Sequence, residues 1–346
     1  MSRIEEMLSE LPGCSRVGQY RAEVDGWPVD RLEALGHAIL ASGDAQHWAV
    51  RSVLDHVLNL LALSPSDERA AAVVRVVADG LPLESVRTVA AMLAQGQRAR
   101  VLVSVLAGMP PGDAATELGA CLLHEMILRR MPVDAVAAAW AQRLAGHPLA
   151  ELPLHSLPGE TRVPLPHFGT HAKSHDTPFL PGRVDLITAS GTVPAVARAP
   201  APADLTSAVR TWLTRSNGRA EAAMCTLDPP VSPGSVGVRT IEALGLDCLA
   251  GGGLALRRAS LDEVVPVLFA AAAYGGAYDE GLGGAYGREA AWRSLNALAG
   301  GSHVGCAWWL FDAANDWFQR IAWDLGVLCL RPGGHVMAVL ASTDSD

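Results

Sequence analysis

The sequence predicts an α+β protein in which a helical N-terminal part precedes a smaller part of mixed helices and strands. Residues 28–148 carry apolar side chains at helical spacing, as Leu54, Val57 and Leu61 show. Prolines then crowd residues 148–181, and short alternating segments typical of strands follow among further helices. The chain has 346 residues and half of them are hydrophobic, so it is long enough for two cores.

The N-terminal part is predicted to hold a series of helices bounded by residues that begin or end helices. Such helix-starting and helix-ending residues, namely Ser, Pro, Asp and Gly, occur together at 64–66, 79–80 and 108–112. The predicted helices are residues 30–40, 44–63, 66–78, 83–95, 98–107, 113–130 and 133–144.

A short pattern recurs within this part. Residues 27–30, 81–84 and 131–134 each read apolar, proline, apolar, acid, and each is followed by a predicted helix. Proline fixes φ and suits the first helical turn, and the acid favours the positive end of the helix dipole. The copies stand roughly fifty residues apart, a spacing typical of helical repeat arrays. We therefore expect either a helical-repeat domain or, if the pattern is only helix-start chemistry that recurs, a non-repetitive bundle.

The composition shifts predict three regions: a helical domain at residues 1–148, a linker rich in proline and histidine at 149–182, and a mixed domain at 183–346. In the mixed domain a helix should begin at Ser260, where Glu263 completes a capping box. The predicted strands are residues 184–189, 221–227, 304–311, 320–330 and 336–340, and the predicted helices are 204–215, 235–244 and 260–273.

Composition excludes several classes of function. The net charge is −9 and no arginine cluster offsets it, so we expect no nucleic-acid partner. Lys173 is the only lysine, and its neighbours fit neither a Schiff-base nor a phosphate-loop motif. Residues 281–286 place a tyrosine where a dinucleotide fingerprint needs its third glycine. We therefore expect neither a nucleotide nor a pyridoxal phosphate cofactor.

Cysteine usage and hydropathy indicate a cytoplasmic protein. The six cysteines are irregularly spaced and form no Cys-x-x-Cys pair, and the N-terminal residues are polar and acidic, unlike a secretory leader. Reduced thiols are the simplest interpretation. Charged residues or prolines interrupt the apolar runs before they reach a membrane-spanning length, so we expect no membrane partner.

Glycine and aromatic residues are concentrated between residues 268 and 324, in a chain that is only 5% aromatic. The phrase Gly-Gly-Ala-Tyr occurs at 275–278 and again at 283–286. Glycine lets the backbone approach a ligand closely, and tyrosine offers an apolar face with a polar tip, which suits a pocket wall. Alternatively, the stretch is a helix end, a connection and the start of the next helix, with the tyrosines filling the core.

The pocket interpretation assigns roles to nine residues. Asp279 or Glu280 would act as general acid or base, and Tyr278 and Tyr286 would orient the substrate by hydrogen bonds. Arg288 would pair with these carboxylates or with an anionic ligand, unless it only ties two helices together. The remaining predicted ligand-binding residues are Tyr274, Trp292, Arg293 and Trp323.

Histidines spaced four apart suggest a metal site. His167, His171 and His175, with Asp176 beside the last, would share one face of a helix and could hold zinc or iron. The prolines and the glycine among these residues argue against a continuous helix, so solvated histidines are the alternative. No other cofactor is expected.

Parts of the C-terminal sequence resemble a known family. Residues 274–278, 283–288, 291–295, 323–326 and 338–346 resemble uncharacterised actinobacterial proteins that share a domain of unknown function. The resemblance implies a shared fold in the C-terminal part and carries no activity.

Two functions remain open. The first is an enzyme or binding protein for a small organic molecule, with its site at residues 274–288; specialised metabolism would suit the actinobacterial resemblance. The second is a helical-repeat module without catalytic activity that presents a concave face to a protein partner. A cavity lined by Tyr278, Tyr286 and Trp323 would favour the first, and an exposed apolar groove along the helices would favour the second.

Overall fold

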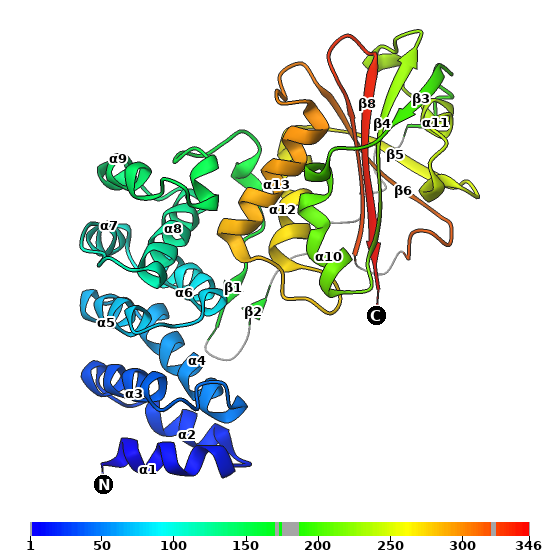
Figure 1. Cartoon of the computed structure of the whole chain (residues 1–346). Helices are drawn as coiled ribbons and strands as arrows, with labels where there is room; N and C mark the ends of the chain where they lie inside the picture. The colour runs from blue at the N-terminus through cyan, green and yellow to red at the C-terminus, as the bar shows by residue number, and fades with distance from the viewer. Residues whose placement is uncertain (1, 170–172, 175–186, 320–322, 346) are drawn as a thin grey trace. The chain divides into compact units, whose positions relative to one another are not determined.

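The computed structural model describes residues 2–169, 173–174, 187–319 and 323–345 and confirms the α+β class (Figure 1). The chain divides into two compact units, each described here by itself. The first unit comprises Met1–His155 and Pro166–Ser174, and the second comprises Ser156–Leu165 and His175–Asp346. The predicted linker is thus shared between the units. The Gln95 side chain exchanges two hydrogen bonds with the backbone of Phe168 in the first unit, whereas Glu160 forms an ion pair with Arg288 in the second.

The first unit is a stack of helices in two layers, preceded by α1 (Arg3–Glu10). Within each layer every helix packs on the next one (Figure 1). One layer contains α3 (Val29–Ala41), α5 (Asp67–Ala78), α7 (Ala99–Ala107) and α9 (Asp134–Arg143), and the other contains α2 (Val17–Val24), α4 (Trp48–Leu63), α6 (Leu83–Gly96) and α8 (Asp113–Leu128). The structural repeat is therefore a pair of helices.

The proline pattern marks helix starts but is not this repeat. It precedes α3, α6 and α9, and α6 lies in the other layer from α3 and α9. Helices of the α3 layer begin 32 to 38 residues apart instead of about fifty. Pro28 and Pro82 also stand at the N-cap, in extended backbone, and not inside the first turn as predicted.

Helices α1 and α2 were not predicted, and each buries a single side chain in full, Met7 in α1 and Val24 in α2. The sequence of α2 shows no clear apolar stripe. In α1 the signals were present, since Ile4, Met7 and Leu8 stand at helical spacing and Ser2 and Glu5 form a capping box. Among the described residues, no helix is both long enough and apolar enough to cross a bilayer.

The second unit is built on a six-stranded antiparallel sheet with the order β3-β4-β8-β7-β6-β5. The strands are β3 (Ala195–Ala199), β4 (Arg219–Asp228), β8 (Val336–Asp344), β7 (Trp323–Leu330), β6 (Ala307–Ala313) and β5 (Leu254–Ala259). A separate two-stranded ribbon of β1 (His167–Phe168) and β2 (Lys173–Ser174) belongs to the first unit.

Both faces of the sheet are covered. Helices α12 (Leu261–Tyr274) and α13 (Gly283–Ala299) pack on one face (Figure 1). The other face packs against residues 231–249, which include α11 (Val238–Glu242). Burial on both sides explains why β6, β7 and β8 are almost continuously apolar in sequence.

Two edge strands were not predicted from the sequence, and one segment predicted as a continuous helix is partly a 3₁₀ turn. β3 is largely exposed and β5 contains adjacent arginines, so neither shows the alternation used for prediction. The predicted helix 204–215 is a 3₁₀ turn at Ala203–Val209 followed by the short α10 (Arg210–Arg215). Residues 187–189 of the predicted strand 184–189 are not in a strand, and residues 184–186 and 320–322 of the predicted strands lie outside the described residues.

Candidate functional site

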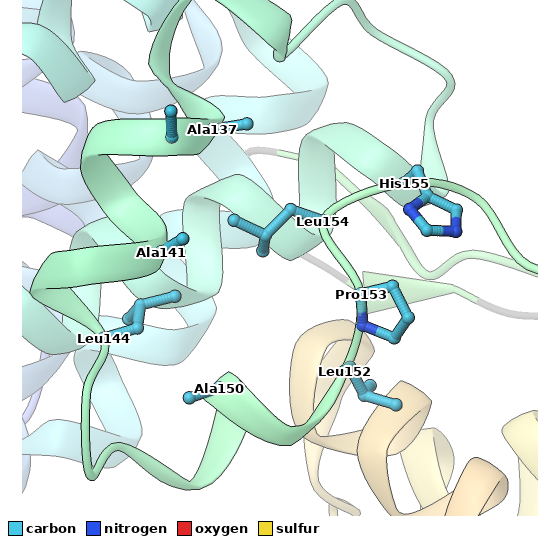
Figure 2. Close-up of a pocket in the computed structure, with 9 residues that line it drawn as sticks. Ala137, Ala141, Leu144, Ala150, Leu152, Pro153, Leu154 and His155 are labelled. Atoms are coloured by element: carbon cyan, nitrogen blue, oxygen red, sulfur yellow. The ribbon is translucent and has the colours of Figure 1, made fainter.

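A cavity of about 470 Å³ lies beside α9 in the first unit (Figure 2). Its wall comes from one face of α9 and from the chain that follows the helix, and Figure 2 shows Ala141 and Leu144 facing Leu154 across it. The lining residues are Ala137, Ala138, Ala141, Leu144, Ala150, Leu152, Pro153, Leu154 and His155. The small alanine side chains leave the space open.

Trp140 and Arg143 fix α9 in place. The buried indole of Trp140 donates to the carbonyl of Leu106 at 3.2 Å, and the Arg143 guanidinium lies 4.8 Å from the centre of its ring. Gly119 of α8 makes room for the indole, since a Cβ there would come within 1.8 Å of a Trp140 ring atom. These contacts hold the helix whose alanines border the cavity.

Two histidines hold the chain segment that forms the other wall. His147 precedes the 3₁₀ turn Pro148–Glu151, and its Nδ1 accepts from the Leu149 N–H at 3.2 Å. The buried His124 donates from Nε2 to the Leu149 carbonyl at 3.1 Å. Both polar backbone groups of Leu149 are thereby satisfied, which fixes the turn that leads into residues 150–155.

Glu117 connects this turn to the helices. Because Nδ1 of His147 is an acceptor, Nε2 carries the proton and donates to the buried Glu117 carboxylate at 3.0 Å. Arg87 of α6 contributes a second charge-assisted bond at 2.7 Å, and Cys121 donates a weaker one at 3.7 Å. Burial, and next the Glu117 charge, raise the pKa of the Cys121 thiol, which therefore remains a donor. The network sets the position of the cavity wall.

The lining of the cavity is almost wholly apolar. Eight of its nine residues are Ala, Leu or Pro, and His155 supplies the imidazole. The cavity is open to solvent, and Ala138, Ala141, Ala150, Pro153 and His155 are exposed. An apolar wall with a hydrogen-bonding group matches the usual composition of a small-molecule site.

Other cavities lie elsewhere among the described residues. One of about 370 Å³ runs between α5 and α7. One of about 360 Å³ follows a polar face of α4 that includes the exposed Trp48 and Arg51. One of about 430 Å³ is formed by residues 314–319 of the second unit. None of these cavities is lined by the aromatic residues between 274 and 292 that the sequence singled out.

The glycine-rich stretch 274–288 is a connection between two helices. Helix α12 ends at Tyr274 and α13 begins at Gly283. Gly275 and Gly281 have φ of +76° and +72°, and a Cβ on Gly281 would come within 2.4 Å of the Ala273 carbonyl oxygen. At Gly276 a Cβ would meet a carboxylate oxygen of Asp344 at 1.8 Å. Here glycine allows backbone segments to pack against each other.

Arg288 and Trp292 bind a carboxylate that the sequence did not single out. Arg288 is buried and pairs with Glu160 through two nitrogens, at 2.6 Å and 3.2 Å. The Trp292 indole donates to the same carboxylate at 2.7 Å. Arg288 thus pairs with Glu160, a residue outside the predicted site, and its predicted pairing with Asp279 or Glu280 stays a prediction. Sequence reasoning missed Glu160 because it lies among prolines in the predicted linker.

The tyrosines and tryptophan of the predicted site lie in different surroundings. The Tyr278 side chain is 62% exposed, whereas Tyr274 is buried and donates to the Pro164 carbonyl. Tyr286 is half-buried on α13, and Trp323 begins β7 opposite Asp344.

The charged residues of the predicted site are also dispersed. The Asp279 side chain is buried, with Oδ1 3.8 Å from Arg215, while Glu280 is exposed. Arg293 pairs with Glu289 and with Asp204. The catalytic and ligand-binding roles assigned to these residues stay predictions.

The predicted metal site lies mostly outside the described residues. His167 is exposed in β1, and His171, His175 and Asp176 are not among the residues described. Within the described ranges, no group of three or more His, Cys, Asp or Glu side chains is placed to hold a metal ion. The zinc or iron site stays a prediction.

Comparison with known proteins gives a family without an assigned activity. No curated protein and no solved structure matches the chain. A family model described as a family of unknown function, DUF6183, matches residues 17–346 and so extends through both units. The chain belongs to the DUF6183 family.

Proposed function

We propose that the protein binds a small, largely apolar organic molecule in the cavity beside α9, with His155 providing a hydrogen bond to it. The observation that carries the proposal is the cavity itself, about 470 Å³ in volume and lined by Ala, Leu and Pro side chains around one imidazole. Small-molecule sites commonly have volumes of about 300–1,000 Å³ and a few polar groups in an apolar wall.

The way the cavity is built supports a binding role. Its two walls are held by Trp140, Arg143, His147 and Glu117, all of which lie behind the lining. A site whose wall is fixed before the ligand arrives loses less conformational entropy on binding. The free cysteines of the described chain agree with a reducing, cytoplasmic location, which we include in the proposal.

The alternative is a protein-interaction module, and the groove between α5 and α7 favours it. This groove is lined by apolar residues such as Val74, Val101 and Val105, and it follows the layer that ends at α9. Repeat arrays bind peptides along such surfaces. Because the α9 cavity is lined more uniformly by apolar groups, we place ligand binding first.

A matched pair of alanine substitutions tests the proposal. Ala141 lines the cavity, whereas Ala139 is exposed on the same helix and does not line it. In a thermal-shift screen of apolar compounds with one hydrogen-bonding group, ligands should raise the Tm of the wild type and of Ala139→Leu. Ala141→Leu should strongly reduce this shift, because the leucine side chain projects into the space that the ligand would occupy, while the unliganded Tm changes little.

His155→Phe provides a second measurement. It keeps an aromatic ring in the lining and removes the hydrogen bond, so the Kd of a discovered ligand should rise about tenfold, equal to about 1.4 kcal/mol. If ligands shifted the Tm of Ala141→Leu as strongly as that of the wild type, the cavity would not be the site. Binding of peptides alone, lost on Val105→Glu and kept by Ala141→Leu, would support the interaction module instead.

A further inference from the structure

Two cysteines of the second unit lie next to each other across the sheet. In the β6–β7 pairing Trp308 stands opposite Cys329, and Cys306 comes two residues before Trp308. Cys306 directly precedes β6, and its thiol is in contact with the Cys329 thiol. If the strand geometry continues by one residue, the two cysteines are diagonal neighbours on one face of the sheet. It is the face covered by α12 and α13, because Trp309 and Leu328 belong to the core on the other side.

The surroundings of the two thiols differ. Cys306 is partly exposed, and its thiol donates to the Ser302 carbonyl at 3.4 Å. Cys329 is fully buried in β7. A peroxide in solution can therefore reach the first sulfur and not the second, while the second is positioned to react with the first.

The pKa shifts agree with this division. Contact with the Cys329 thiol lowers the pKa of Cys306 below the ordinary thiol value, and the positive charge of Arg331 acts in the same direction against burial. The contact with Cys306, followed by burial, raises the pKa of Cys329 far above that value. Arg331 is fixed beside the pair by donating to the carbonyls of Leu298 and Ala297 at 3.0 and 2.8 Å.

We propose that Cys306 and Cys329 are a peroxide-responsive thiol pair, in which Cys306 is oxidised first and Cys329 then closes a disulfide. The Cys306 thiolate attacks one oxygen of hydrogen peroxide, the O–O bond breaks and hydroxide leaves, giving a sulfenic acid. The Cys329 thiol then attacks the sulfenic sulfur, the S–O bond breaks and water leaves. Peroxide gains two electrons and the two thiols lose them.

The loop before β6 provides the movement that the bond requires. Diagonal residues in an antiparallel pair have Cα atoms about 7–8 Å apart, whereas disulfides usually span about 4.4–6.8 Å, so an approach of about 1 Å is needed. Cys306 lies just before β6, after Gly300, Gly301 and Gly305, all at positive φ. A glycine-rich loop can adjust at lower cost than a paired strand, and β7 itself can remain in place.

Other cysteines of the chain serve as internal controls. Cys14 is partly exposed like Cys306, but it belongs to the first unit, and Cys225, also in the sheet, is fully buried. If exposure alone decided reactivity, Cys14 and Cys306 would react alike. The proposal requires that Cys306 react faster and that its product include Cys329.

The experiment treats the full-length protein with hydrogen peroxide and maps its cysteines by mass spectrometry. The wild type should lose two hydrogens and yield one peptide pair joined through Cys306 and Cys329. Cys329→Ser should stop at a sulfenic acid on Cys306 that a dimedone probe traps, and Cys306→Ser should form neither product. Cys14→Ser should behave like the wild type.

Peptide mapping of the wild type alone decides the question if a variant fails to fold. A disulfide between any other two cysteines, or equal oxidation of Cys14 and Cys306 without a cross-link, would overturn the proposal. Alkylation by iodoacetamide between pH 6 and 9 gives an independent readout. The Cys306 rate should rise at a lower pH than the rate of a free thiol such as N-acetylcysteine in the same buffer, and the reverse order would contradict the assignment of Cys306 as the attacking thiolate.

Discussion

Two regions rich in small residues, the connection between α12 and α13 and the cavity face of α9, use them in opposite ways. In the connection, added Cβ atoms on Gly275, Gly276 and Gly281 would lie 1.8–2.5 Å from neighbouring atoms, so glycine brings polypeptide segments together. On α9, Ala137 and Ala141 border a cavity of about 470 Å³. The residues are small in both places, yet one region is filled and the other is open.

The difference depends on what the rest of the chain supplies to each region. The Asp344 carboxylate, at the end of β8, lies against the connection and accepts a hydrogen bond from the Ala277 N–H at 2.7 Å. It therefore occupies space that a ligand would need. Beside α9, the large side chain of Trp140 packs on Gly119 of α8 and donates to the Leu106 carbonyl, and it does not line the cavity. A small residue therefore indicates a cavity only where no neighbouring element fills the space.

The largest effect on the free energy of unfolding is expected from Arg288→Met, on α13 next to the filled connection. The substitution keeps most of the side-chain volume but leaves the buried Glu160 carboxylate without its cationic partner, which should lower the free energy of unfolding by about 4 kcal/mol. Urea denaturation measures the change. Glu242→Gln, at an exposed position on α11, is the control and should change it by less than about 0.5 kcal/mol.

A double variant separates the lost ion pair from general damage to the core. In Arg288→Met with Glu160→Leu the carboxylate that Arg288→Met leaves without its cationic partner is removed as well, so a substantial part of the lost stability should return. If the double variant is as unstable as the single one, the cost comes from packing, and the ion pair does not account for the stability of this region.

Gly281→Ala should have the next largest effect. It adds strain at a φ of +72° and brings a Cβ within 2.4 Å of the Ala273 carbonyl oxygen, so we expect a loss of about 3 kcal/mol. Gly283→Ala is the matched control, because Gly283 has the same φ and no atom within 4 Å of the added Cβ. Its loss should be about 1 kcal/mol, the cost of the backbone conformation alone. Equal losses in urea denaturation would show that this connection is not tightly packed.

Much of the fold could be predicted from the sequence because it follows from local chemistry. Helix α4 repeats buried residues at helical spacing, and α12 begins at Ser260, whose backbone N–H donates to Glu263 as the capping box predicts. The first six residues of the buried strand β8, 336–341, read as one apolar run. β5 was missed because it carries Arg258, whose guanidinium lies 4.9 Å from the Trp309 ring, a contact that is invisible before the sheet is formed.

The candidate site was less predictable because it is made by contacts distant in sequence. The cavity depends on residues 150–155 returning to α9, and Glu117, thirty residues before His147, fixes that return. The alanine-rich run at 137–141 and the Pro-Leu segment at 153–154 were visible, but nothing local indicated that they face each other. Glycine next to tyrosine was read as a pocket wall because spacing alone does not show whether Asp344 fills the space.

The smallest effect on stability, and the sharpest choice between the two regions, is expected from Tyr278→Ala. The Tyr278 side chain is 62% exposed, so its removal should change the free energy of unfolding by less than about 0.5 kcal/mol. The variant therefore remains folded and can be titrated with any ligand that the thermal-shift screen finds. Unchanged affinity in Tyr278→Ala, together with lost affinity in Ala141→Leu, would place the ligand beside α9. The opposite result would restore the glycine-rich connection as the binding region and assign the α9 cavity no part in binding that ligand.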